Sequence, residues 1–360
     1  MSPISRNRRT ERRRRALKNA RKTPSVETYQ RTQRLLGRYA RIVQAHGKPG
    51  ITSVHDSRHA GTVGLYAEKL ARFFGASPKV ASMAAMTGFT HDRIRIPSEK
   101  LMDRNEAFRV LSREFPAGTP PEKIHGLVEK AFALQGGKVT DFAMTGKGIT
   151  SDELTAVFLR DKLAKRLPRH AVERVLNAIR LTGKVPSKEK FRKDLVQSGL
   201  HFADKFFEAN GAFIAFRRAY FMGERKDRRE EMARNSWSTQ EAATNITLNE
   251  TGKRIKAYSD LTRIPPVFHP FVKYQVSWQH RLREGLERRE VWAVHLATHF
   301  FEEGLKFDTG QPVRSLETTI REYKPIGETD AAFKAETLRY LDGGLWETFL
   351  QLTQRPGKRK

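Results

Sequence analysis

Residue types that bind divalent cations mark both ends of one stretch of the chain, residues 59–92. His59 opens this stretch, and the adjacent pair His91 and Asp92 closes it. Imidazole nitrogens and carboxylate oxygens together suit Mn, Fe, Co, Ni or Zn without choosing among them. A cation held in this way lowers the pKa of a bound water, so metal-assisted hydrolysis is the chemistry to consider.

Two helices are expected to position these residues. Asp56 or Ser57 can cap a first helix, which Gly75 ends, and its apolar residues recur at steps of three and four: Val63, Tyr66, Ala67, Leu70, Phe73 and Phe74. Ser77 and Pro78 then indicate the start of a second helix, with the buried face Val80, Ala81, Ala84, Ala85 and Phe89. If the two helices pack antiparallel, His59, His91 and Asp92 come within reach of one ion.

A fourth candidate ligand, Asp204, lies in the apolar segment LHFADKFFEA. An unpaired buried carboxylate is costly, so this one needs a partner. Two interpretations stay open: a shared metal ion, or a salt bridge with Lys205 or an arginine elsewhere.

Over residues 50–222 this pattern resembles the HD-domain metal-dependent phosphohydrolases, whose signature is a His, later a His-Asp pair, and a late Asp. His59, Val63, Ala67, Leu70, Ala71 and Gly75 fit the spacing of the first helix, and Ala203-Asp204 fits the late Asp. The resemblance implies one ion held by His59, His91, Asp92 and Asp204. After the pair, the family has isoleucine-glycine-lysine; here Arg95 takes the place of the lysine and the glycine is lost.

The resemblance also implies roles in hydrolysis of a phosphate ester by a metal-activated water. Asp92 would bind the ion and orient the water, and Arg95 would hold the phosphate in a bidentate way. His55, one helical turn before His59, is either a rival first ligand, a residue near the substrate, or a solvent-exposed histidine. The implied substrate is a nucleotide or nucleic-acid phosphate. The alternative is a non-catalytic RNA-binding protein with a degenerate HD core.

Charge favours polyanionic partners. The chain has 68 Lys and Arg against 40 Asp and Glu, a net charge of +28. Residues 1–22 hold ten Lys or Arg and one Glu, and their arginine run Arg12, Arg13, Arg14 and Arg15 is expected to be disordered until it meets RNA or DNA phosphates. The chain has no cysteine and no apolar run of membrane-spanning length, so a cytoplasmic protein without a membrane partner is expected.

Scarce strand alternation predicts an all-α fold, an HD-like bundle with additional C-terminal helices. The predicted divisions are a basic arm (1–22), an HD-like domain (23–222), a polar linker (223–236), a helical region of unassigned role (237–354) and a basic tail (355–360). His125 and His170 are expected on helix surfaces rather than at a second metal. His295 and His299 lie one helical turn apart, where packing is favoured over metal binding. The oligomeric state stays open.

Overall fold

The computed structural model describes residues 26–28, 30–32, 57–94, 101–135, 148–182, 193–208, 211–224, 226–306 and 315–353. Throughout these residues the chain is helical, and the only pairing of extended backbone is an antiparallel bridge between Met102 and Ile149. The predicted all-α fold is confirmed.

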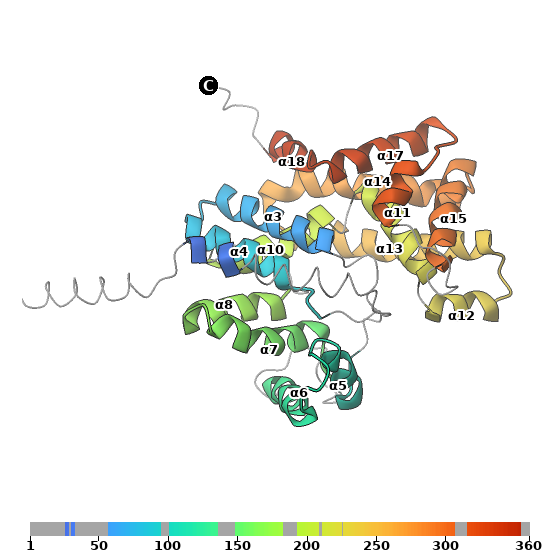
Figure 1. Cartoon of the computed structure of the whole chain (residues 1–360). Coiled ribbons are helices and arrows are strands. Elements are labelled where there is room, and N and C mark those ends of the chain that lie inside the picture. Colours follow the sequence, from blue (N-terminus) through green and yellow to red (C-terminus); the bar gives the residue numbers. More distant parts are fainter. Residues whose placement is uncertain are drawn as a thin grey trace, which may run out of the picture.

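A helical hairpin forms the centre of the first half (Figure 1). Helix α3 (Ser57–Phe73) ends before Gly75, whose φ of +82° is the left-handed conformation that favours glycine. Helix α4 (Pro78–Thr90) begins where predicted, and the Ser77 hydroxyl accepts the backbone N–H of Val80. The chain therefore reverses in four residues, and α4 packs along α3.

Two glycines allow these helices to touch. A Cβ atom added at Gly88 would lie 2.7 Å from the Cα of Gly64, and one added at Gly64 would meet the backbone oxygen of Ala85 at 3.0 Å. Because neither position has room for a side chain, the backbones of α3 and α4 approach as closely as two helices can.

The next helices along the chain lie below this hairpin in Figure 1, except α10 (Leu195–Phe202), which lies beside α4. Their bounds are α5 (Arg104–Ser112), α6 (Pro121–Gln135), α7 (Ser151–Ala164), α8 (Arg169–Arg180) and α10 (Leu195–Phe202). Helix α10 packs on both α3 and α4, and α8 supports α4 and α10 from the other side. A π-helical turn, η2 (Ala203–Glu208), continues α10.

The second half is a bundle built around α11 (Ala212–Glu224), which packs on α13 and α15. Its other helices are α12 (Lys226–Arg234), α13 (Thr239–Ser259), α14 (His269–Glu287), α15 (Val291–Leu305), α16 (Leu316–Glu322), α17 (Glu328–Leu341) and α18 (Leu345–Thr353).

A layer of aromatic rings joins the two halves, and we call it the aromatic seam: Phe74, Phe202, Phe206, Phe207, Phe268, Phe271 and Phe349. Phe268 stacks on Phe202 with ring centroids 4.0 Å apart and planes 8° from parallel. Both rings are fully buried, and residues of both halves belong to one continuous core. The C-terminal helices are thus packed directly against the helices that carry the predicted ligands.

Within the stretch 223–236, for which the composition predicts a polar linker, the structure has a helix. Residues 226–234 form α12, and Arg228 joins it to α13 through a 3.1 Å ion pair with Glu250. Glu224, at the end of α11, is buried. Ion pairs hold this helix together with Met232, which packs against the core. Its sequence is otherwise polar, which is why it resembles a loop.

Candidate metal centre

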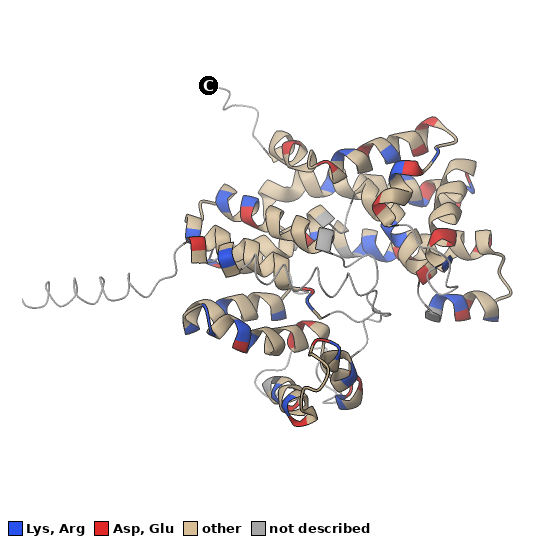
Figure 2. Ribbon diagram, in the orientation of Figure 1, with Lys and Arg blue, Asp and Glu red and all other residues tan. Residues whose placement is uncertain are grey.

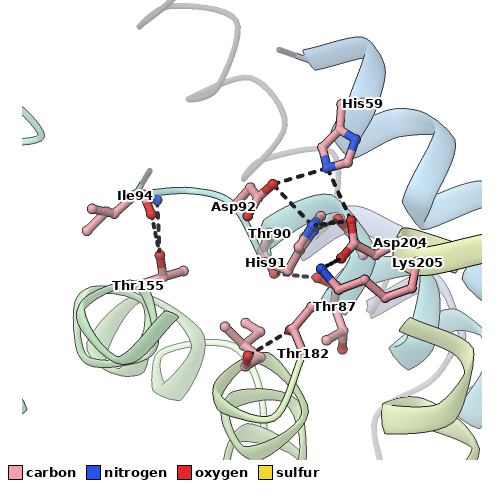
Figure 3. Close-up of polar contacts among 12 residues, drawn as sticks. His59, Thr87, Thr90, His91, Asp92, Ile94, Thr155, Thr182, Asp204 and Lys205 are labelled. Atoms are coloured by element: carbon pink, nitrogen blue, oxygen red, sulfur yellow. Dashed lines mark hydrogen bonds and ion pairs between the residues drawn. The ribbon is translucent and has the colours of Figure 1, made fainter. Parts of the chain in front are cut away.

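Three elements place the predicted ligands at one point (Figure 3). His59 stands in the first turn of α3, His91 caps the C-terminus of α4, and Asp204 lies in η2. Because α3 and α4 run antiparallel, the start of one helix meets the end of the other. All three side chains are buried, at 1%, 1% and 6% exposure.

The ligand atoms converge. One nitrogen from each of His59 and His91 and one oxygen from Asp204 all lie within 4.8 Å of one another. Oδ2 of Asp92 lies 3.1 Å from Nε2 of His59 and 3.3 Å from Nε2 of His91. Oδ1 of Asp204 lies 3.6 Å and 3.7 Å from the same two nitrogens. This buried group of His59, His91 and Asp204 could hold a metal ion, with Asp92 in contact with both histidines.

The backbone fixes which nitrogen of His91 faces the carboxylates. Nδ1 lies 2.7 Å from the carbonyl oxygen of Gly88 and donates its proton to it. In neutral His91, Nε2 therefore presents a lone pair to the oxygens of Asp92 and Asp204. A lone pair that faces carboxylate oxygens at this range requires a positive charge between them, either a proton or a metal cation.

The electrostatics of the centre agree. Burial lowers the pKa of His91, but Asp92 and Asp204 outweigh burial and raise the pKa to about 10. Burial likewise would raise the pKa of Asp204, but Lys205 first and then His91 hold it well below its usual range. Asp204 therefore stays ionised at neutral pH and attracts a cation to the centre.

Asp204 forms the predicted ion pair with Lys205 and also faces the two histidines. Its Oδ1 faces the two histidines, and its Oδ2 accepts a 2.8 Å ion pair from Nζ of Lys205. Lys205 is 30% exposed at its side chain, whereas Asp204 is 9% exposed. The lysine thus orients the carboxylate from the solvent side and leaves the inner oxygen directed at the centre.

Asp204 and Lys205 belong to the π-helical turn η2. A π-helix accommodates one more residue per turn than the α-helix around it, is rare, and occurs frequently at functional sites. Here the turn places a carboxylate next to two histidines while its later residues Phe206 and Phe207 enter the aromatic seam.

A third buried histidine, His201, lies three residues before Asp204 in the chain. His201, in α10, is 2% exposed, and its Nδ1 donates to the carbonyl oxygen of Thr182, 2.9 Å away. Burial lowers the pKa of His201 to about 4, more than the bond to Thr182 can offset. His201 is therefore neutral in the folded protein at neutral pH.

We expect His201 to make stability depend on acid pH. The pKa of His201 is 6.5 in the unfolded chain and about 4 in the folded chain, so between these pH values only the unfolded chain binds a proton at His201. The free energy of unfolding should fall as pH falls through this window, by on the order of 3 kcal/mol. His201→Asn keeps a donor for Thr182 and cannot titrate, so denaturant unfolding at pH 4 to 7 should show a flatter profile. Exposed His170→Asn serves as the control; equal slopes for wild type and His201→Asn would contradict the prediction.

The other predicted residues divide into two groups. His55, Arg95 and the run Arg12 to Arg15 lie outside the described residues. Of the remainder, His125 is exposed and stacks on Phe108 with centroids 4.1 Å apart, as expected of a surface histidine. His295 and His299 pack against Tyr323, and in the described part of the chain no third ligand joins them.

Two features of the centre have weak signals in sequence. His201 precedes Asp204 by three residues, the spacing of one helical face, but a histidine among phenylalanines gives no sign of a bond to Thr182. The π-helical turn leaves no mark in the hydrophobic pattern. Only the adjacency of Lys205 to Asp204 could be read directly, as an ion pair.

Comparison of the chain with families of known proteins, with curated proteins and with solved structures finds no match. Within the described residues, no helix combines the length and apolar character needed to cross a membrane.

Proposed function

We propose that this protein is a metal-dependent phosphohydrolase or phosphodiesterase that acts on a nucleotide or nucleic-acid phosphate. One observation carries the proposal: buried nitrogens of His59 and His91 and oxygens of Asp92 and Asp204 converge at one point. It rests on the donor set and on the order His, His-Asp, Asp along the chain, which resembles the HD-domain phosphohydrolases.

The residues present fit a single divalent ion. The hydrogen bond from Nδ1 of His91 to the carbonyl oxygen of Gly88 directs Nε2 of His91 toward the ion. The ion pair of Lys205 with Oδ2 of Asp204 leaves Oδ1 of Asp204 directed toward the ion. Two imidazoles and two carboxylates leave positions open in a six-coordinate ion, and the set suits Mn, Fe, Co, Ni or Zn. Such an ion supplies an activated water and a positive charge beside phosphorus.

The residues of the chain would contribute orientation and proton transfer. Oδ2 of Asp92 lies 3.1 Å and 3.3 Å from the two histidine nitrogens, so Asp92 is suited to bind the ion and to accept a proton from the attacking water. Lys205, at the solvent side of Asp204, is placed to contact a phosphate oxygen. The reaction would be direct attack of water, because the centre presents no serine, threonine or cysteine nucleophile among the ligands.

The test is metal content together with manganese-dependent hydrolysis of bis-p-nitrophenyl phosphate and a nucleotide panel. Wild type should bind one ion per chain. His91→Ala and Asp204→Asn should each lose the ion, and activity should fall at least about a thousandfold, because a bound cation supplies several kcal/mol of transition-state stabilisation.

His170→Ala is the matched control, because His170 is an exposed histidine on α8 that should leave both measurements unchanged. Thermal unfolding of each variant separates loss of the site from loss of the fold. A wild-type protein without stoichiometric metal, or activity that survives in both ligand variants, contradicts the proposal. Salt-dependent RNA binding through the +28 charge would then be the function to pursue.

A further inference from the structure

A buried ion pair begins one residue after the metal centre. Nη2 of Arg93 lies 2.8 Å from Oε2 of Glu114, with the two side chains 10% and 8% exposed. Arg93 directly follows Asp92, so this pair is tied through the backbone to a predicted ligand. A pair this deeply buried costs desolvation, and on its own it gives only weak stabilisation.

Helix α7 brings another cation to the same place. The hydroxyl of Thr155 accepts the backbone N–H of Ile94 at 3.0 Å and lies 3.2 Å from the carbonyl oxygen of Ile94, fastening α7 to the turn after Asp92 (Figure 3). Thr155, Phe158 and Lys162 follow at steps of three and four, so they share one face of α7. Lys162 therefore lies on the side of α7 that faces Arg93.

Two aromatic rings lie next to the two lysines of this region. Nζ of Lys162 lies 3.8 Å from the ring centroid of Phe158, and Phe158 meets Phe115 edge to face at 5.7 Å. Nζ of Lys123, on α6, lies 5.6 Å from the ring of Phe115, the neighbour of Glu114. We call Arg93, Lys123 and Lys162 together the cation cluster.

Positive charge exceeds negative charge here. Arg93 contacts Glu114, and the three cations together with this carboxylate sum to a charge of +2. Burial lowers the pKa of Lys162 to about 8, and Arg93 and then Lys123 add to the effect, while Glu114 opposes it. Arg93 and Lys162 are partly buried, and like charges held together at such a place are a candidate site for a ligand that neutralises them.

We propose that the cation cluster of Arg93, Lys123 and Lys162 binds a phosphate monoester dianion beside the metal centre. The excess of two positive charges matches the charge of near −2 on a phosphate monoester, whereas a nucleic-acid phosphodiester carries −1. That the phosphate belongs to the substrate rests on the proposed function; that the cluster binds phosphate does not. The substrate would then carry a terminal phosphate as well as the phosphate at the metal.

The probe is inorganic phosphate, added to the full chain in EDTA at about 0.15 M salt, where binding by exposed lysines is screened. NMR of labelled lysine side chains follows Lys162, whose resonance is identified by its disappearance in Lys162→Met. Phosphate should shift this resonance saturably and raise the pKa of Lys162. Lys165→Met, an exposed lysine on the same turn of α7's end, should leave the binding constant unchanged.

A second variant gives an effect of opposite sign. Glu114→Gln removes the carboxylate paired with Arg93, so phosphate binding should tighten about tenfold, while Arg93→Gln should weaken it by a similar factor. Unfolding curves confirm that both variants are folded. A Lys162 resonance that does not respond to phosphate, or weaker binding in folded Glu114→Gln, overturns the proposal.

Two further outcomes separate the alternatives. An oligonucleotide without terminal phosphates should not shift Lys162, and an equal response to it would overturn the assignment to a monoester. Because the probe acts without metal, a chain that binds phosphate at Lys162 but binds no metal would refute the proposed hydrolase and leave this site standing. A chain that binds metal but whose Lys162 resonance does not respond to phosphate would refute this phosphate site and leave the proposed hydrolase standing.

Discussion

Gly88→Ala is expected to weaken metal binding by at least about 100-fold and to lower the free energy of unfolding by about 1–3 kcal/mol. The new Cβ would lie 2.7 Å from both N and Cα of Gly64, which are backbone atoms and cannot rotate away. Helices α3 and α4 must therefore separate. His59 and His91 stand on opposite sides of that contact, so their nitrogens separate too. A calorimetric titration with metal measures the loss of metal affinity.

Gly61→Ala is the matched control on α3. Its Cβ would meet only Cε1 of Phe89, at an ordinary 3.8 Å, so metal affinity should not change. Stability should rise slightly, since alanine favours a helix over glycine by up to about 1 kcal/mol. Normal metal affinity in folded Gly88→Ala would show that the close contact of these helices does not set the distance between the ligands.

Phe268→Ala is expected to lower the free energy of unfolding by about 3–5 kcal/mol, the cost of removing a fully buried ring. Phe268 stacks on Phe202 of α10 and also contacts Phe74 and Phe349, so its removal opens a cavity in the middle of the aromatic seam. Because α10 leads into η2, metal affinity should fall with it. Urea unfolding with and without metal measures both effects.

The control for Phe268→Ala is Phe73→Ala, which removes the same side chain from a position 38% exposed. Its ring touches Trp346 and Phe349 at the edge of the seam, so the loss should be about 1–2 kcal/mol. Equal losses in the two variants would mean that the seam does not join the halves of the protein. Loss of stability in Phe268→Ala with unchanged metal affinity would limit its role to packing.

Local chemistry made the hairpin predictable. Gly75 stops α3 with a left-handed backbone, and Ser77 with Pro78 starts α4, because these residue types have strong and short-range preferences. With both helix ends known, the meeting of His59 with His91 follows from antiparallel packing. The presence of Asp204 at the same point needed the tertiary fold, since more than 100 residues separate it from His91.

Other features could not be predicted, for identifiable reasons. Helix α12 has one large apolar residue, Met232, and is also held by Arg228, so hydrophobic periodicity misses it. The aromatic seam joins residues that are distant in sequence, and nothing local pairs Phe202 with Phe268. Figure 2 shows basic residues on helices throughout the described chain, so the +28 charge does not by itself locate a binding surface. The cation cluster joins residues from separate segments of the chain, Arg93, Lys123 and Lys162, so it depends on how α6 and α7 pack in the fold.

The π-helical turn has a consequence for any change in chain length. Successive residues of an α-helix rotate by about 100°, so one inserted or deleted residue turns everything beyond it out of phase. In η2, the wider turn lets Asp204 face the histidines while Phe207 faces the C-terminal bundle. Shortening this element by one residue would restore an ordinary helix and force a choice between the two orientations. The chain would keep either Asp204 at the candidate metal centre or Phe207 in the aromatic seam, but not both.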